Sequence, residues 1–335
     1  MEFGLFDQLP CAPSQSPAAR YADIIAQCQL ADKLGLDTVW LAEYHFSPRF
    51  SIMPAPLLIA SAIAQTTGRI KVGTAVNLVP LHQPVRLAEE VATLDVLSQG
   101  RAIFGIGRGS NPSHYEGFGV AVDEGRPRFV EALEVVLKAW TEEQLFYEGQ
   151  YYQAQGVQVV PKPYQQPHPP VYIAANSPDT FPLVGALGHN ILVTPLIITS
   201  EGVRNGLEVY RQKLSEHGYD PAQVKIIPTL VAYVADDRKK AHAGLEPTVN
   251  NYLNVIRMGR SRGAGRAMGL TYEEISNEYA IAGDPQECIH RLEAFQEMFQ
   301  CQGFMFWFNI GGLLPHEEVA RSMRLFAEKV MPHFQ

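Results

Sequence analysis

Short apolar runs alternate with longer amphipathic segments along the whole chain. The short runs are rich in β-branched and aromatic side chains, a pattern that predicts buried strands. In the longer segments the apolar positions recur every three or four residues, which predicts helices that cover those strands. We expect strands at residues 3–7, 38–43, 69–75, 101–107, 170–175, 190–193, 225–234 and 303–308.

A helical pattern follows each predicted strand, and one further segment departs from this alternation. The helices are expected at residues 18–36, 54–66, 83–97, within 125–140, 178–187, 200–217, from 238 onward and 316–330. Residues 145–163 instead alternate between apolar and polar positions, and this period of two predicts a hairpin.

Eight strand–helix alternations without a break in composition indicate a single (β/α)8 barrel over residues 1–335. We expect insertions in this barrel at about residues 144–165 and about residues 244–282. Two doubly wound sheets are the rival architecture, and we disfavour them because no linker divides the chain. In a (β/α)8 barrel the catalytic side chains come from the C-terminal ends of the strands, so the candidate residues lie there.

The composition narrows the class of protein. With 46% hydrophobic and 19% charged residues, the 335-residue chain is typical of a globular enzyme with a large core. Its net charge of −8 argues against nucleic acid or an anionic membrane as the main partner. No apolar run approaches the roughly 18 residues that a membrane span needs, and the N-terminus shows no secretory signal. Four cysteines without CxxC spacing predict a reduced, cytoplasmic protein. Ten scattered histidines without HxxxH or HExxH spacing predict no metal site.

The ends of the fourth and fifth strands carry the residues of an anion site. The fourth strand ends in "FGIGRG", where Arg108 supplies a forked cation between glycines. The fifth ends in "AANSPDT", where Asn176, Ser177 and Thr180 surround the expected helix start, with Ser177 as the N-cap residue. Because neighbouring strands point these residues at one spot, they predict a phosphate site. A tight turn and an ordinary helix cap are the alternatives, and the adjacent Asp179 favours the cap because it competes with a phosphate.

The other strand ends indicate a flat ligand. Small residues at 73–75 leave room at the barrel mouth on one side, and aromatic residues at 306–308 lie on the other. A phosphate anchor beside such a slot predicts a planar phosphorylated cofactor. With one anion site, flavin mononucleotide (FMN) fits better than a dinucleotide.

Seven stretches, in order, carry a resemblance to a known family: "FGLF", "GLDTVWLAEYHF", "IKVGTAVNLVPLHQPVRLAEEVATLDVLSQGR", "FGIGRG", "PPVYIAANSPDT", "GDPQECI" and "SMRLFAEKVMP". Over nearly its whole length the chain resembles the bacterial luciferase-like flavin monooxygenases, close to the luciferase alpha chain. The resemblance implies a (β/α)8 barrel that binds reduced FMN, with its phosphate at Arg108, Asn176, Ser177 and Thr180. It also implies a non-prolyl cis peptide between Ala75 and Val76, beside the flavin ring. Luciferase has a glutamate at the position of Asn176, so one negative charge is removed here.

The resemblance implies a reaction and its partners. A separate reductase supplies reduced FMN, O2 is the co-substrate, and a flavin hydroperoxide oxygenates a small or medium organic molecule. Two other functions stay open: a deazaflavin-dependent hydride transferase on the same fold, and a flavin-binding subunit without catalytic activity.

The end of the second strand departs from the family pattern. Luciferase-like chains commonly carry Glu-His-His there, whereas this chain has Glu43, Tyr44 and His45. Tyr44 takes the position of the family's active histidine, and strand alternation places His45 on the opposite face. A phenol donates a hydrogen bond but is a poor base near neutral pH, so we expect oxygenation without light emission. His45 is either catalytic or a hydrogen-bonded histidine of the barrel wall. His114, in the loop after the fourth strand, either contacts substrate or lies on the loop surface.

Two further segments carry expectations about assembly and closure. The helix at residues 54–66 is apolar around most of its circumference, which predicts a dimer through the second and third helices, either with a second copy or with a homologous subunit. The basic, glycine-rich segment at residues 257–269 predicts a mobile lid over the site, with a plain solvated loop as the alternative.

Overall fold

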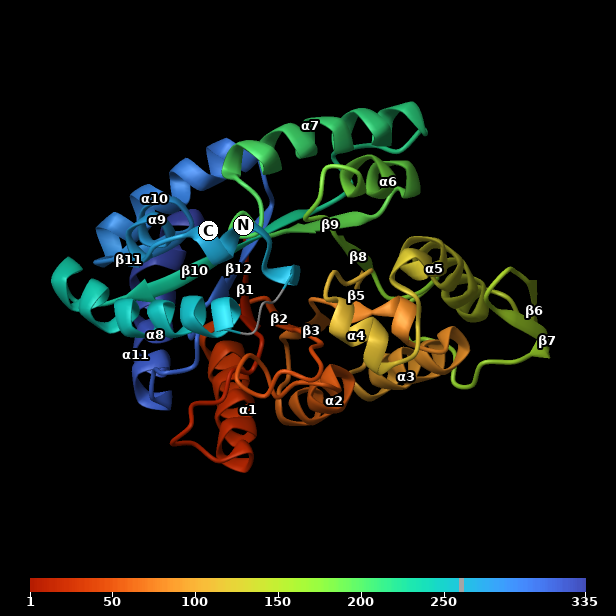
Figure 1. Ribbon diagram of the computed structural model, residues 1–335, viewed down its shortest axis with the longest axis horizontal. Coiled ribbons are helices and arrows are strands. Elements are labelled where there is room, and N and C mark those ends of the chain that lie inside the picture. The colour runs from red at the N-terminus through yellow and green to blue at the C-terminus, as the bar shows by residue number, and fades with distance from the viewer. Residues whose placement is uncertain (259–261) are drawn as a thin grey trace.

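Eight parallel strands close into one barrel in the computed structural model, which describes residues 1–258 and 262–335 (Figure 1). Around the barrel they follow the order β1, β2, β3, β5, β8, β9, β10 and β12, and β12 pairs with β1 to close the ring. The (β/α)8 prediction is therefore confirmed, and the rival of two doubly wound sheets is wrong. The barrel strands are β1 (Glu2–Asp7), β2 (Thr38–Leu41), β3 (Lys71–Thr74), β5 (Ala102–Gly107), β8 (Val171–Ala174), β9 (Asn190–Val193), β10 (Ile226–Val234) and β12 (Gly303–Trp307).

The helices form the outer layer of the molecule (Figure 1). Those that follow the barrel strands are α1 (Pro17–Leu34), α2 (Pro56–Thr66), α3 (Pro84–Leu97), α5 (Gly125–Thr141), α6 (Thr180–Leu187), α7 (Ser200–Glu216), α8 (Arg238–Met258), α10 (Pro285–Phe299) and α11 (His316–Leu325). Their starts carry local signals, since Ser16, Gln83, Thr199 and Asp284 accept hydrogen bonds at N-caps, and several first turns hold a proline.

Smaller elements decorate this frame. β6 (Leu145–Glu148) and β7 (Gln153–Val157) form the predicted antiparallel hairpin beside α5. The sequence did not predict β4 (Asn77–Leu78), α4 (Pro112–Gly117), α9 (Tyr272–Glu278), β11 (Ala280–Gly283) or the 15-residue helix α10. β11 pairs with the C-terminal half of β10. Short 3-10 or π turns span Val79–Leu81, Val122–Glu124, Arg262–Gly269, Phe326–Val330 and Met331–Phe334.

Trp40 lies in the barrel interior, where its ring packs edge-on against Tyr172 at 5.1 Å between ring centroids. Trp40 is 1% exposed, and its indole N–H donates to Thr38 Oγ1 at 2.8 Å. Glycines of neighbouring strands make its room: a Cβ at Gly4 would lie 2.9 Å from the indole nitrogen, and one at Gly73 would lie 2.8 Å from the ring. Side chains fill the barrel interior in this way, and the ligand site of a (β/α)8 barrel is expected at the C-terminal ends of the strands.

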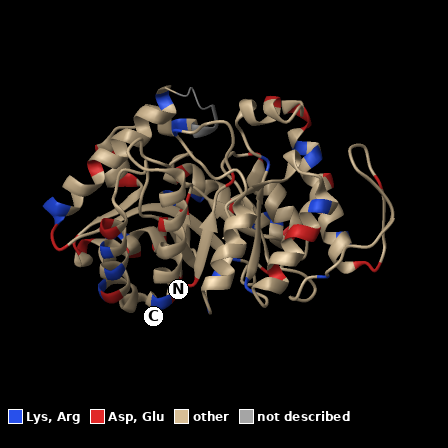
Figure 2. Cartoon of the chain, turned by 90° about the horizontal axis from the view of Figure 1, so that it is seen from below, with Lys and Arg blue, Asp and Glu red and all other residues tan. Residues whose placement is uncertain are grey.

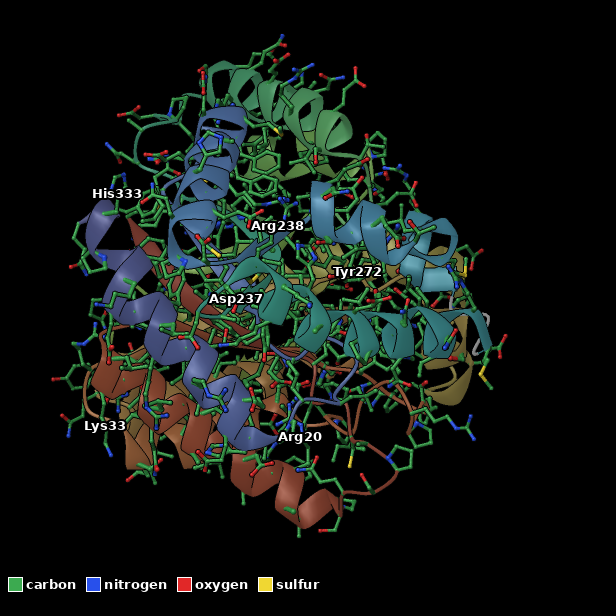
Figure 3. All side chains as sticks on the ribbon, turned by 90° about the vertical axis from the view of Figure 1, so that its left-hand side faces the viewer. Arg20, Lys33, Asp237, Arg238, Tyr272 and His333 are labelled. Carbon is green, nitrogen blue, oxygen red and sulfur yellow. The ribbon has the colours of Figure 1, made fainter. Side chains whose placement is uncertain are left out.

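A buried ion pair fixes the loop that leaves β1. Arg20, labelled in Figure 3 at the start of α1, is 1% exposed and donates to Asp7 at 2.5 Å. Its Nε atom also donates to the carbonyl oxygen of Pro10 at 2.9 Å. The pair ties the first helix to the C-terminal end of the first strand, at the face where the site is expected.

The second strand ends earlier than predicted. We expected it to reach residue 43, but β2 stops at Leu41. From there the backbone turns to loop partners, since the N–H of Glu43 bonds to Val76 and that of Tyr44 bonds to Met53. Tyr44 and His45 therefore lie in a loop above the strand, where strand alternation does not set their directions.

Charged residues of both signs lie on the outer helices of the molecule. Basic and acidic residues are interspersed over the outer helices (Figure 2). The termini lie side by side, with the N-terminal nitrogen 3.5 Å from the carbonyl oxygen of Phe334 (Figure 1). Among the described helices, none is long and apolar enough to cross a membrane.

Candidate active site

A cavity of about 300 Å³ opens at the C-terminal ends of β5 and β8. The predicted residues Val76, Arg108, Asn176, Ser177 and Thr180 all line it. Ala75, the remaining predicted residue, joins Val76 through a cis peptide bond, as the sequence resemblance implied. The structure therefore gathers the predicted cofactor residues around one opening.

A hydroxyl and carboxylate cluster forms one rim of the cavity. Ser177 Oγ donates to Asp179 Oδ1 at 2.6 Å and lies 2.8 Å from Thr180 Oγ1. We expected Ser177 to cap the following helix, but α6 begins only at Thr180, because residues 177–180 form a turn in which the Thr180 N–H bonds to the Ser177 carbonyl oxygen. Asp179 occupies the N-cap position and makes no side-chain cap bond. The hydroxyl groups are thus turned toward the cavity rim rather than spent on helix capping.

Arg126 is a site residue that sequence reasoning missed. It lies in the first turn of α5, lines the cavity, and donates from Nη1 to Asp179 Oδ2 at 2.7 Å. Arg108 is exposed, and within residues 1–258 and 262–335 its guanidinium makes no ion pair. The signal for Arg126 was available, since the helix after the fourth strand begins at the same mouth as the helix after the fifth. The cavity therefore holds two guanidinium groups and two hydroxyls.

Asn176 links two strand ends and keeps a donor for the cavity. Its Oδ1 atom accepts a hydrogen bond from the N–H of Thr194, at the end of β9, at 2.9 Å. Its amide nitrogen has no hydrogen-bond partner among the described residues. A neutral donor therefore lies beside the hydroxyl and guanidinium groups.

The floor of the opening is built from small residues at close quarters. Gly107 lines the cavity, and a Cβ added there would lie 2.6 Å from Val76 Cγ2. Ala174, on the next strand, also lines the cavity. A flat ring system can lie on such a floor, where a larger side chain at position 107 would collide with Val76.

A buried carboxylate organises the residues behind the opening. Glu43 is 4% exposed and accepts hydrogen bonds from His45 Nε2 at 2.8 Å and His82 Nε2 at 2.9 Å. Asn77 Nδ2 and the N–H of Leu78 also donate to it, both at 3.0 Å. Burial alone would raise the pKa of Glu43, but these hydrogen bonds outweigh burial and lower it to about 2. Burial would lower the pKa of His82, whereas its bond to Glu43 raises it.

Tyr44 and His45 form hydrogen bonds with different partners. The His45 ring bonds to Glu43, as the barrel-wall alternative predicts. The Tyr44 ring instead packs against Phe50 at 4.3 Å and against His114 at 4.5 Å between ring centroids. Its phenol oxygen accepts a hydrogen bond from Asn111 Nδ2 at 3.0 Å. The two side chains therefore differ in their hydrogen-bond partners, although both rings pack against His114.

His114 is buried, which rules out the loop-surface alternative. It is 3% exposed, and its Nε2 atom accepts from the N–H of His45 at 3.4 Å and lies 3.3 Å from Asn111 Nδ2. Burial and, to a smaller degree, the neighbouring His45 lower the pKa of His114 to about 4. His114 is therefore neutral at physiological pH, with Nε2 as an acceptor.

Aromatic side chains form the opposite wall of the barrel mouth. Trp307 of β12 packs edge-on against Phe6 at 5.4 Å and against Tyr252 at 5.3 Å, and Tyr252 continues to Phe50 at 6.0 Å. In the barrel order β12 and β1 lie across from β5 and β8. Of the aromatics that the sequence placed near the mouth, Phe306 and Phe308 instead pack outward against Phe326.

Two further predictions from the sequence concern the lid and metal binding. Residues 257–269, the proposed lid, include residues 259–261, which lie outside the described part of the chain. Within the described residues no group of three or more histidine, cysteine, aspartate or glutamate side chains is arranged to hold a metal ion.

Comparison with known proteins connects this geometry to a family. A family model described as luciferase-like monooxygenase matches residues 1–300. The oxygenase component of the flavin-dependent trigonelline monooxygenase of Acinetobacter baylyi is 29% identical, over 100% of this chain and 96% of that protein. An alkanal monooxygenase alpha chain of Photorhabdus luminescens is 26% identical, over 99% of this chain and 96% of that protein. The uncharacterized protein y4wF of Sinorhizobium fredii is 38% identical, but the match spans 57% of this chain and 55% of that protein.

Solved structures share the fold over the full chain. The monooxygenase RslO1 of Streptomyces bottropensis superimposes with a TM-score of 0.90 at 29% identity, covering 100% of both chains. The oxygenating constituent of 3,6-diketocamphane monooxygenase of Pseudomonas putida, in complex with FMN, has a TM-score of 0.85 at 23% identity, covering 99% and 98%. An F420-dependent secondary alcohol dehydrogenase has a TM-score of 0.79 at 20% identity, covering 98% of both chains. At these lower identities the likeness shows the fold alone.

Proposed function

Because the chain belongs to the luciferase-like monooxygenase family, we propose that it is an oxygenase component that uses reduced FMN and O2 to oxygenate a small or medium organic molecule. The resemblance seen in the sequence is confirmed at the level of this family. One observation carries the proposal: Arg108, Arg126, Ser177 and Thr180 converge on one cavity beside a floor of small residues.

The residues present suit FMN. Its terminal phosphate needs cations and hydrogen-bond donors, and the cavity offers two guanidinium groups, two hydroxyls and the Asn176 amide. Gly107 and Ala174 leave the floor flat, so the ring system would lie near the Ala75–Val76 peptide. When bound, reduced FMN supplies the electrons that activate O2.

The other side chains have roles in positioning and in excluding water. The aromatic wall of Phe6, Phe50, Tyr252 and Trp307 keeps the mouth apolar on the side away from the anion site. Tyr44 presents a phenol at this wall, held through its oxygen by Asn111. A phenol orients a substrate oxygen by a hydrogen bond but does not accept a proton readily at neutral pH. Of the predicted catalytic residues we therefore assign substrate contact to Tyr44, with His114 behind it.

His45 and Glu43 act behind the mouth. Since Glu43 binds both His45 and His82, it fixes the loop that carries Tyr44 and joins it to the segment after β3. We assign His45 a positioning role rather than contact with the reacting atoms.

The partners follow from the proposed reaction. The trigonelline relative is described as an oxygenase component, and we propose that this chain likewise receives reduced flavin from a separate reductase. The exposed apolar face of α2, including Leu58 at 73% exposure, supports a dimer through α2 and α3. The second chain is either an identical copy or a homologous subunit.

An anaerobic titration discriminates between the candidate functions. We expect reduced FMN to bind more tightly than a deazaflavin, and alanine at Arg108 to weaken FMN binding. Tighter binding of the deazaflavin favours hydride transfer. This second candidate is retained because an F420-dependent dehydrogenase shares the fold. If reduced FMN binds tightly and, once oxygen is then added to the titrated sample, reacts as free reduced FMN does, the result favours a flavin-binding subunit. Failure to bind either cofactor contradicts the proposal.

A further inference from the structure

We propose that Asp179 stands in for a phosphate at the anion site and thereby weakens the grip of the protein on its flavin, so that the cofactor exchanges readily. This inference deepens the proposed function and rests on it. It concerns a carboxylate placed among the groups that would otherwise bind an anion.

The carboxylate of Asp179 accepts hydrogen bonds from a hydroxyl group and from a guanidinium group of the site. Its Oδ1 atom accepts a hydrogen bond from Ser177 at 2.6 Å, and its Oδ2 atom accepts one from Arg126 at 2.7 Å. A phosphate oxygen would use the same hydroxyl and the same guanidinium. A phosphate that enters the cavity must therefore take the single hydroxyl proton of Ser177 from Asp179 and share the Arg126 guanidinium with it.

Ordinary helix capping does not explain this carboxylate. Asp179 occupies the N-cap position of α6, where aspartate commonly accepts from the backbone of the first turn. Here it has helical backbone angles (φ −77°, ψ −12°) and makes no side-chain cap bond. Its oxygens are turned to the cavity rim instead. The side chain is committed to the anion site, not to the helix.

The charge of Asp179 persists at neutral pH and opposes a phosphate. The hydrogen bond from Ser177 lowers the pKa of Asp179 most, and the guanidinium groups of Arg126 and Arg108 lower it further. Two guanidinium charges and one carboxylate leave the site with one net positive charge, whereas a phosphate monoester brings up to two negative charges. Both side chains of the Arg126–Asp179 pair are about half exposed, so solvent screens the repulsion and the effect on affinity is moderate rather than prohibitive.

Weak binding of the flavin phosphate suits a protein that receives its flavin from another enzyme and releases it after each turnover. If a reductase delivers the reduced flavin, the oxidised flavin must leave after each turnover. As the phosphate departs, the Asp179 carboxylate again accepts hydrogen bonds from Ser177 and Arg126, so these donors are not left unpaired. The sequence indicated that Asp179 competes with a phosphate, and the structure adds that the carboxylate binds Ser177 and Arg126.

The test compares flavins with and without a phosphate. Asp179→Asn keeps the size of the side chain and removes its charge, and Asp123→Asn, an exposed acid that does not line the cavity, controls for the change in net charge. The dissociation constants of FMN and riboflavin are measured by flavin fluorescence for each protein. We expect Asp179→Asn to lower the FMN dissociation constant by about fivefold or more, a size typical of one partly screened charge. Riboflavin binding should not change, and neither should FMN binding by the Asp123→Asn protein.

A second variant and a second probe separate the outcomes. Asp179→Glu restores the charge and should bind FMN as the unaltered protein does, while thermal unfolding shows whether each variant is folded. The shift of the unfolding temperature with inorganic phosphate alone should be larger in Asp179→Asn. If FMN affinity depends on Arg108 but is unchanged or weaker in Asp179→Asn, the role of Asp179 is overturned and the proposed function stands. If the folded proteins bind neither FMN nor phosphate, both are overturned.

Discussion

Glu43 accepts a hydrogen bond at 2.8 Å from Nε2 of His45, which lies two positions further along the chain, and both residues are buried. The bond holds the imidazole to this carboxylate, whereas the phenol oxygen of the adjacent Tyr44 is bound by Asn111, and both rings pack against His114. His82 completes the arrangement from the segment after β4, at 2.9 Å from the same carboxylate.

Replacing Glu43 with glutamine should destabilise the protein by about 3 kcal/mol at pH 7, because two histidines and an amide lose a buried anionic acceptor. The free energy of unfolding in urea measures the loss. The folded-state pKa of Glu43 is depressed to about 2, below its ordinary value of 4.5. The contribution of this carboxylate is therefore complete above about pH 4.5 and declines as the pH falls toward about 2.

A matched control supports this interpretation. Glu293, half exposed on α10, pairs with His333 Nε2 at 2.9 Å. Glu293→Gln should change stability by less than about 0.5 kcal/mol. Equal losses in the two variants would mean that Glu43 has no special role.

Alanine at Arg108 should weaken FMN binding by about tenfold or more while leaving riboflavin binding unchanged, because only the phosphate contact is lost. Alanine at Arg126 should have a smaller effect, since that guanidinium already pairs with Asp179. Fluorescence titration measures both. Arg128, two residues further along α5 and paired with Glu124 at 2.7 Å, is the matched control. A loss of riboflavin binding as large as that of FMN would place the phosphate elsewhere.

Phenylalanine at Tyr44 should leave flavin binding intact and increase the share of O2 released as hydrogen peroxide, because the phenol oxygen that Asn111 holds is removed. Peroxide yield per reduced flavin consumed, measured with substrate present, reports the change. Histidine at Tyr44 restores the residue type of the family pattern and should alter the same yield. If neither variant differs from the unaltered protein, the reacting centre lies elsewhere on the barrel mouth.

Glutamate at Leu58 should split the expected dimer, because it places a charge on an apolar helix face that is 73% exposed in the single chain. Light scattering of both proteins at micromolar concentration measures the masses. A monomeric mass for the unaltered protein would refute the dimer, whatever the variant does. Val122, which is 52% exposed and lies away from α2 and α3, provides the control position for the same substitution.

Much of the fold followed from periodicity alone. The eight barrel strands were placed within about two residues because buried parallel strands are continuous apolar runs bounded by helical patterns. Small elements such as β4 and α9 escaped prediction because they are short and depend on tertiary partners. The end of β2 was misjudged because bonds from Glu43 to Val76 and from Tyr44 to Met53, which no local pattern reveals, draw the chain out of the sheet.

The site likewise contains residues that the sequence predicted and residues that only the folded structure revealed. Arg108, Ser177 and Thr180 were found because their chemistry and their strand ends coincide in sequence. Arg126 was missed because its role depends on where α5 begins relative to α6, and His82 because only the folded chain brings it to Glu43. The burial of His114 and the turn that frees Ser177 from capping are likewise properties of packing.

The most direct test of the proposed function is the reaction of the protein, loaded anaerobically with reduced FMN, with dissolved oxygen in a stopped-flow spectrometer. The absorbance of oxidised flavin is followed without and then with candidate organic substrates. We predict that oxidised flavin appears much more slowly than with free reduced FMN, because the apolar mouth excludes water, and that a productive substrate lowers the release of hydrogen peroxide. Oxidation at the rate of free reduced FMN, with tight flavin binding, would contradict an oxygenase function.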